Sequence, residues 1–182
     1  MPPVTPEPIT AKSGFIAFWQ TSAAGAKISS RSSGVRLVSS IERATKTLRS
    51  KSAAMIVLDI DEFKRINDDF GHPTGDAVIL GVVGCLRRIV GERGFIGRVG
   101  GEEFTVLLPG HDPDSAALLA ERMREAIGES LVVPPVDRSI TASFGVSNNA
   151  AGTGFDTAYG LADAALYRAK RGGRNRVEFA DQ

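Results

Sequence analysis

The sequence predicts one α+β domain in which helices cover a mixed sheet, and three observations lead to this expectation. The chain has 182 residues, 42% of them hydrophobic and 24% charged, which is enough to bury a core. Short aliphatic runs alternate with longer stretches whose apolar residues recur every three or four positions. The expected order of elements, α-β-α-α-β-β-α-β-α-β, contains no internal repeat and is typical of such a sheet.

The first part of the chain is expected to be an extension or linker, residues 1–33, because four of its first eight residues are proline. The apolar segment 15–19, FIAFW, is expected to fold back on the domain, and a contact between two copies is the alternative. The domain itself is predicted to span residues 34–182. It begins with a helix from Val35, whose apolar stripe consists of Leu37, Ile41, Ala44 and Leu48.

The middle of the chain alternates apolar strands with helices. The run AAMIVLDI is nearly continuous in aliphatic residues and predicts a buried strand that ends in acidic residues. A short helix and loop follow, and Pro73 opens a long helix that reaches Val90. Two strands then enclose a Gly-Gly turn to form a hairpin. These elements are predicted at residues 53–60, 61–72, 73–90, 94–99 and 103–109.

The last third of the chain is predicted to hold two further helices and two strands. Asp112 before Pro113 is a good helix start, and Gly128 is expected to end that helix. The closing helix is expected to stop at Gly172-Gly173. The remaining elements are predicted as a strand at 139–147, a helix at 156–170 and a strand at 175–180.

Charge and cysteine content exclude several classes of protein. The net charge of +1 gives no whole-chain case for nucleic acid or an acidic membrane, although residues 1–52 carry about +6 and residues 53–182 about −5. A single cysteine, Cys85, rules out a disulfide framework and fits a reducing compartment. No run reaches the roughly 18 apolar residues of a membrane span, and the first residues lack a signal-peptide pattern. A cytoplasmic location is therefore expected.

Acidic residues gather at two places that the fold could bring together. Asp59 and Asp61 come at the end of the strand at 53–60, and Glu102 and Glu103 follow the Gly-Gly turn. If the two places meet, three or four carboxylates share one site, and a hard cation such as Mg²⁺ would neutralise them. The alternative is a set of solvated acids on loops.

Polar side chains crowd a glycine-rich stretch after that strand. Lys64, Asn67, Asp68, His72 and Asp76 fall within thirteen positions. Asp and Asn are good partners for a guanine edge, because the carboxylate accepts from its N–H groups and the amide can serve its other polar atoms. His72 alone is better explained as a hydrogen-bonding residue of a loop than as a metal ligand.

Two cations bracket the glycines that follow the closing helix. Lys170 and Arg174 at a flexible helix end suit the binding of a triphosphate. The alternative to this role is the ordinary interaction of cations with the C-terminal end of a helix dipole.

Taken together, these stretches resemble the GGDEF family, the diguanylate cyclase domain, over residues about 35–180. DIDEFKRINDDFGHPTGDAVIL matches the family's D-x-D-x-F-K-x-I-N-D-x-x-G-H-x-x-G-D-x-x-L. GGEEF is one of the two usual forms of its signature, and ADAALYRAKRGGRN matches its closing A-D-x-A-L-Y-x-A-K-x-x-G-R-N. Three ordered and correctly separated motifs do not arise from solvated acids.

The resemblance implies a polymerase-palm-like fold with a ferredoxin-like core, a central, mainly antiparallel sheet flanked by helices. It also implies that a homodimer condenses two GTP molecules into cyclic di-GMP and pyrophosphate, with Mg²⁺ or Mn²⁺. By the same resemblance, the metal ligands are Asp59, the Ile60 carbonyl and Glu102, with Glu103 beside them; guanine is read by Asn67 and Asp76; and the phosphates and the rest of the substrate meet Phe63, Lys64, His72, Lys170 and Arg174. Of these, Lys64, Glu102, Glu103 and Lys170 are the candidate catalytic residues.

Two departures from the family pattern bear on function. The family's D-x-L-T-G-L-x-N-R segment is replaced here by GAKISSRSSG, residues 25–34, beside the expected guanine pocket. The family's R-x-x-D product-inhibition site reads GERG at 91–94. The alternatives to an enzyme are a catalytically weak module that binds GTP or cyclic di-GMP and regulates a partner, which the first departure favours, and a purely structural dimerisation domain.

Overall fold

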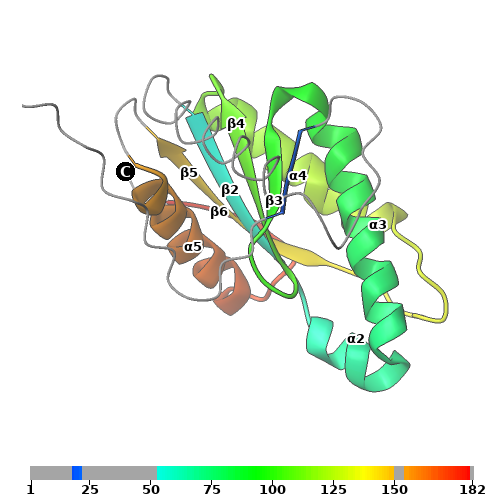
Figure 1. The fold of residues 1–182 in the computed structure, drawn as a ribbon. Helices are drawn as coiled ribbons and strands as arrows, with labels where there is room; N and C mark the ends of the chain where they lie inside the picture. The colour runs from blue at the N-terminus through cyan, green and yellow to red at the C-terminus, as the bar shows by residue number, and fades with distance from the viewer. Residues whose placement is uncertain (1–17, 22–52, 150–153, 181–182) are drawn as a thin grey trace, which may run out of the picture.

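A computed structural model of the protein describes residues 18–21, 53–149 and 154–180. Their six strands form one sheet in the order β1-β3-β4-β2-β5-β6 (Figure 1). The strands are β1 (Phe18–Thr21), β2 (Ala53–Ile60), β3 (Phe95–Arg98), β4 (Glu103–Pro109), β5 (Ala142–Asn149) and β6 (Val177–Phe179). The helices are α2 (Phe63–Phe70), α3 (His72–Val90), the 3₁₀ turn η1 (Gly91–Arg93), α4 (Pro113–Ser130) and α5 (Phe155–Arg171).

The sheet is mainly antiparallel, which confirms the expected fold class. Every neighbouring pair from β1 to β5 is antiparallel, and only β5 and β6 run parallel. The four strands β2, β3, β4 and β5 with their helices follow the β-α-β-β-α-β path of a ferredoxin-like core. Strand β2 lies at the centre of that core, between β4 and β5.

Alternation along β2 assigns its side chains to two different cores. Ile56, Leu58 and Ile60 belong to the larger core, with residues of α3 and α4, whereas Met55 and Val57 pack with residues of α5. Figure 1 shows these helices on opposite faces of the sheet. Because side chains of a strand point alternately to its two faces, the next odd-numbered residue of β2, an aspartate, is directed to the α5 side.

Helix α5 lies unusually close to strand β5 at Gly145. A Cβ atom added at Gly145 would lie 2.0 Å from the Ala162 carbonyl oxygen and 2.3 Å from the Leu166 backbone nitrogen. No side chain separates the two elements there, so the glycine is what lets the helix backbone rest directly on the strand.

Most element boundaries agree with those predicted from the sequence, but the predicted end of α4 was wrong. The helix does start after Asp112, whose carboxylate accepts a 2.8 Å hydrogen bond from the Ser115 backbone N–H and so has a lowered pKa. It does not stop at Gly128 but continues to Ser130. A glycine in the last turn weakens a helix without ending it, and here the chain leaves the helix at Leu131, whose side chain packs at Gly81 of α3.

Two further expectations concern the ends of elements. The strand expected at 139–147 begins three residues later, at Ala142. The backbone of β1 pairs with β3, so Phe18 and Trp19 of the apolar segment 15–19 fold back on the sheet, and residues 15–17 lie outside the described residues. The helix expected from Val35 lies outside the described residues. Within the described ranges, no helix is long and apolar enough to cross a membrane.

Candidate active site

Three of the predicted acids meet at one end of the central strands. Asp59 in β2 is the register partner of Glu103 in β4. The Ile60 backbone N–H donates to the Glu102 carbonyl oxygen at 3.2 Å, which joins the hairpin tip to the end of β2. The two acidic places that lie more than forty residues apart in sequence therefore form one cluster.

Lys170 at the end of α5 contacts this cluster directly. Its Nζ lies 2.9 Å from Oδ2 of Asp59, whose side chain is only 16% exposed. Burial raises the pKa of Asp59, and repulsion from Asp61 adds to the rise, while Lys170 and Arg174 oppose it. Lys170 therefore does more than interact with its own helix dipole: it pairs with Asp59, and its charge also lowers the pKa of Glu102 and Glu103.

Glu102 carries the second charge of the cluster. Burial raises its pKa, the nearby charge of Asp59 raises it further, and Lys170 and Arg98 act in the opposite direction. Arg98 also donates from its guanidinium to the carbonyl oxygens of Gly100 and Gly101, so it organises the turn before the glutamates. Sequence reasoning missed Arg98, although its place two residues before Gly100 was a signal.

Glu103 is held by a partner that the sequence did not reveal. The Tyr159 hydroxyl on α5 donates to its Oε1 at 2.9 Å. Burial is the main cause that raises the pKa of Glu103, and the charges of Asp163 and Asp59 raise it further. The same burial, together with Glu103, raises the pKa of Tyr159. All three cluster acids thus have raised pKa values, with burial as the main cause in each case.

The donor atoms of the cluster suit a hard divalent cation. They are carboxylate oxygens of Asp59 and Glu102, with the Ile60 carbonyl as the third expected donor, and Mg²⁺ prefers oxygen ligands. No group of three or more His, Cys, Asp or Glu side chains arranged to hold a metal occurs among the residues that the structure describes. Two carboxylates nevertheless suffice, because Mg²⁺ commonly takes its other ligands from water and substrate phosphates.

The predicted guanine-reading residues lie where α2 meets α3. A Cβ atom at Gly75 would lie 2.0 Å from Oδ1 of Asn67 and 3.1 Å from Cζ of Phe63, so both side chains are packed against this point of α3. Asp76 is the next residue of α3 and is exposed. His72 is exposed too, but it is the first residue of α3 rather than a loop residue, which corrects the expectation for it.

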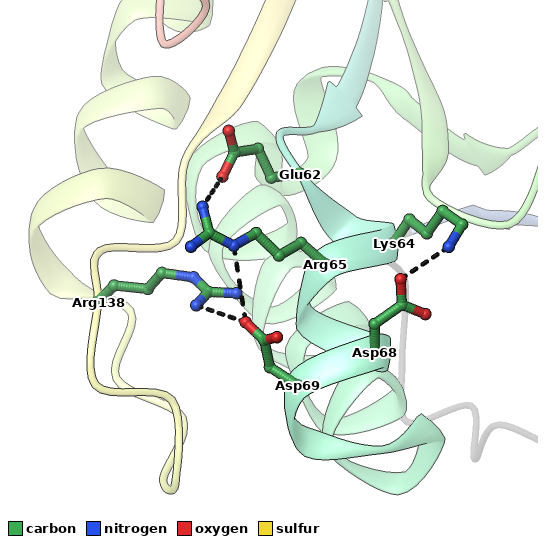
Figure 2. A network of polar contacts seen from close by, with 6 residues as sticks. All are labelled: Glu62, Lys64, Arg65, Asp68, Asp69 and Arg138. Carbon is green, nitrogen blue, oxygen red and sulfur yellow. Dashed lines mark hydrogen bonds and ion pairs between the residues drawn. The ribbon is translucent and has the colours of Figure 1, made fainter.

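Lys64 does not join the acidic cluster in this structure. Its ammonium pairs with Oδ2 of Asp68 at 2.7 Å, one turn along α2, and its side chain is 86% exposed. Figure 2 shows this pair on the side of the helix away from Arg138. An exposed pair of this kind contributes little to stability and can be exchanged readily for another anion.

The other side of α2 is tied to the loop before β5 by Arg138 (Figure 2). Arg138 Nη1 lies 2.9 Å from Oδ2 of Asp69, and its guanidinium lies 5.3 Å from the centre of the Phe70 ring. Arg65 contacts the same Asp69 at 3.7 Å. These contacts fix α2, and with it Asn67, relative to the start of β5, and sequence reasoning missed Arg138.

Arg174 lies in the loop after α5 with a left-handed backbone, φ 62°. Its charge acts on Asp59, so it shares the cluster with Lys170. The carboxylate of the buried Asp61 is not a free metal ligand, because it accepts hydrogen bonds from Thr141, Ser143 and the Asn175 backbone N–H. The sequence left open whether Asp61 points with Asp59, and the chain turns there instead.

Comparisons with known proteins agree on one family. The sequence profile of the family described as "Diguanylate cyclase, GGDEF domain" matches residues 34–176. The diguanylate cyclase DgcP of Pseudomonas aeruginosa is 46% identical over 134 residues, which cover 69% of this chain and 19% of that protein. The chain spans between 19 and 43% of the length of the curated relatives that it matches.

Two solved structures extend this agreement to the fold. The active GGEEF domain of a diguanylate cyclase from Vibrio cholerae has a TM-score of 0.69 and 38% identity, covering 78% of this chain and 90% of that one. The GGDEF domain of DgcB from Caulobacter crescentus, in complex with c-di-GMP, has a TM-score of 0.74 and 30% identity, covering 87% of this chain and all of the other. The profile match, the shared fold and the acidic cluster beside Lys170 together show that the chain belongs to the GGDEF diguanylate cyclase domain family.

Proposed function

We propose that the chain is a diguanylate cyclase that condenses two GTP molecules into cyclic di-GMP and two pyrophosphates. The observation that carries the proposal is the meeting of Asp59 and Glu102 with Lys170 at the end of the central strands. In this arrangement, two carboxylates and the Lys170 ammonium lie close enough for a nucleoside triphosphate and a divalent metal ion to share one site. The proposed domain spans residues 34–182.

The residues that would hold Mg²⁺ or Mn²⁺ are Asp59, Glu102 and the Ile60 carbonyl. A cation bound there supplies positive charge beside the transferring phosphoryl group and lowers the pKa of the attacking hydroxyl. The partial burial of Asp59 and Glu102 supports this assignment, because burial raises the pKa of both carboxyl groups and a divalent cation would stabilise their ionised forms. Glu103, anchored by Tyr159, keeps a further carboxylate next to the reacting groups.

The cationic side chains of the site would bind and orient the triphosphate. Lys170 and Arg174 approach from the end of α5, and Lys64 would exchange Asp68 for a phosphate oxygen. The backbone N–H groups that open α2 receive no side-chain cap, so they are available to an anion. Asn67 and Asp76 would read the guanine, with Phe63 and His72 nearby.

The glycines of the signature support close approach of a nucleotide. A Cβ at Gly101 would meet nothing within 4 Å, and one at Gly100 would make only an ordinary contact at 3.6 Å. Neither glycine adopts a left-handed backbone. The fold therefore does not need glycine at these positions, whereas a nucleotide lying on the turn would.

The reaction requires two copies of the chain. In each half, the 3′-hydroxyl of one GTP releases its proton to solvent and attacks the α-phosphorus of the other. A new P–O bond forms, and the bond from that phosphorus to the α,β-bridging oxygen breaks to release pyrophosphate. One acidic cluster serves one triphosphate, so both bonds form when two loaded domains face each other as a homodimer. A weak module that binds GTP or cyclic di-GMP and regulates a partner is the second candidate, favoured by the altered segment 25–34.

The test is to incubate the protein with radiolabelled GTP or ATP and Mg²⁺ and to resolve the products. We expect cyclic di-GMP from GTP and little product from ATP. Adenine lacks the N1–H group from which the Asp76 carboxylate would accept a hydrogen bond. GTP binding without product would favour the regulatory module. Equal use of ATP and GTP would contradict the assignment of Asn67 and Asp76.

Gly75→Ala is expected to raise the KM for GTP about tenfold with little change in stability. The added Cβ would lie 2.0 Å from Asn67 Oδ1, so the amide must rotate away, and one hydrogen bond to guanine would be lost. The closest atom belongs to the end of a side chain, and Phe63 Cζ at 3.1 Å must shift by only a few tenths of an ångström, which keeps the cost in folding small. Initial rates against GTP concentration measure the effect, with Gly84→Ala on the same helix as the control, since a Cβ at Gly84 meets nothing within 4 Å. An unchanged KM would exclude Asn67 from guanine recognition.

Product inhibition is expected to be competitive with GTP, or absent. The positions of the family's inhibitory Arg and Asp are Gly91 and Gly94, and a Cβ at Gly94 would lie 2.5 Å from the Leu107 carbonyl oxygen, so the backbone there leaves no room for a side chain. Arg93 cannot substitute readily, because its guanidinium donates to the carbonyl oxygens of Ile89 and Val90. Initial rates at several GTP concentrations with added cyclic di-GMP distinguish the cases. A purely noncompetitive pattern at low product concentration would refute this expectation.

A further inference from the structure

Asp61 is a buried carboxylate that binds three separate parts of the chain. Its side chain follows β2 and is only 7% exposed. Oδ1 accepts a hydrogen bond from Ser143 Oγ at 2.7 Å, and Oδ2 accepts from Thr141 Oγ1 at 2.8 Å and from the Asn175 backbone N–H at 3.1 Å. The proposed role of the cluster acids does not use this carboxylate.

The loop that Asp61 binds has an unfavourable backbone. Arg174 and Asn175 both lie in the left-handed region, with φ 62° and 46°, where residues other than glycine are uncommon. Such a conformation persists only where surrounding contacts hold it. Besides the bond to Asp61, the Arg174 N–H donates to Ala169 O at 3.0 Å, and Arg124 Nη1 of α4 donates to Asn175 Oδ1 at 3.3 Å.

We propose that Asp61 is a positioning residue for triphosphate binding, which acts by holding the 172–175 loop so that Arg174 faces the acidic cluster. This inference rests on the proposed function, in which Arg174 binds phosphate. Asp61 ties Asn175 to the segment that leads into β5 and to the end of β2, the strand of Asp59. The backbone of Arg174 is thus fixed relative to Asp59 without any contact between Asp61 and the nucleotide.

The geometry also predicts which substitutions the position tolerates. In Asp61→Asn, the side-chain oxygen can remain at the Oδ2 position and accept from Asn175, while the amide NH₂ faces Ser143, whose hydroxyl can rotate to accept. In Asp61→Ala, the Asn175 N–H loses its acceptor. The asparagine variant is therefore expected to preserve the loop and the alanine variant to release it.

The experiment is a double-mutant cycle between Asp61→Ala and Arg174→Ala. Calorimetry with Mg²⁺ and a GTP analogue that has a methylene bridge between its α- and β-phosphates measures Kd without turnover. Asp61→Ala is expected to raise Kd about tenfold in the wild-type background and by less than about twofold in the Arg174→Ala background. Asp61→Asn is expected to stay within about threefold of wild type.

Ser143→Ala is the matched control, because it removes a donor to Oδ1 and leaves the Asn175 bond on Oδ2 intact. It is expected to leave Kd within about twofold. Equal losses in both backgrounds, or an equal loss in Ser143→Ala, would overturn the positioning role while the proposed function stands. Wild-type protein that does not bind the analogue would overturn both. Should Asp61→Ala fail to fold by circular dichroism, Asp61→Ser, whose shorter side chain cannot span the three donors, takes its place with the same expected non-additivity.

Discussion

Glu102→Gln is expected to lower the rate of cyclic di-GMP synthesis by a factor of about 10²–10³ or more while leaving the fold intact. The substitution keeps the size of the side chain but removes one of the two charges proposed to hold the divalent cation. The transition state then loses part of the positive charge that stabilises the transferring phosphoryl group. Single-turnover rates with saturating GTP and Mg²⁺ measure the loss.

The stability of this variant should move in the opposite direction. Burial and Asp59 raise the pKa of Glu102 in the folded protein, so the stabilising contribution of this group is present at low pH and is lost as the pH rises through the folded pKa. At neutral pH its charge opposes folding, and Glu102→Gln is expected to unfold at an equal or higher temperature than wild type. Glu92→Gln, an exposed residue of η1, is the control. Near-wild-type turnover in Glu102→Gln would refute the metal assignment.

Gly145→Ala is expected to destabilise the protein by about 3 kcal/mol or more, at the upper end of overpacking substitutions. The new Cβ would lie 2.0 Å from Ala162 O and 2.3 Å from Leu166 N. Both are backbone atoms of α5, so no side-chain rotation relieves the contact and the helix must move from the sheet. Because α5 carries Lys170 and Tyr159, synthesis should fall together with stability.

Urea denaturation with and without the substitution measures the free energy of unfolding. Gly160→Ala, in an exposed position of α5 where a Cβ meets nothing within 4 Å, is the matched control. It is expected to stabilise the protein by about 0.5–1 kcal/mol, since alanine favours helix more than glycine does. A loss below about 1 kcal/mol in Gly145→Ala would contradict the close approach of α5 to β5.

Local patterns were sufficient for the strands and for most helix ends. The aliphatic run at 53–60 and the alternation around the Gly-Gly turn predict β2, β3 and β4 almost to the residue, because strand length and turn residues are local properties. Gly128 misled the prediction of the end of α4, since packing of Leu131 at Gly81 decided where the chain leaves the helix. Tertiary contacts outweigh a weak local preference in such cases.

The candidate site, too, was only partly predictable from local sequence patterns. Motifs locate the acids, Asn67 and Lys170, but only the register of β2 with β4 shows that Asp59 and Glu103 lie opposite each other. Tyr159 and Asp61 could not be assigned from sequence, because their partners are 56 and up to 114 residues away. Lys64 lies on the helix expected for it, yet its ammonium pairs with Asp68 one helical turn away and does not join the acidic cluster.

The central position of β2 has a consequence for the dynamics of the site. Asp59 and Ile60 belong to the strand that is hydrogen-bonded on both sides by β4 and β5, so their amides should exchange with solvent only when the whole domain unfolds. Helix α2 packs on the core through Phe63 and Ile66, whereas the 172–175 loop is held by a few hydrogen bonds and can open locally. The reacting centre is therefore rigid while the loop that carries Arg174 can move, and influences from outside the domain would act first on how tightly the triphosphate is bound.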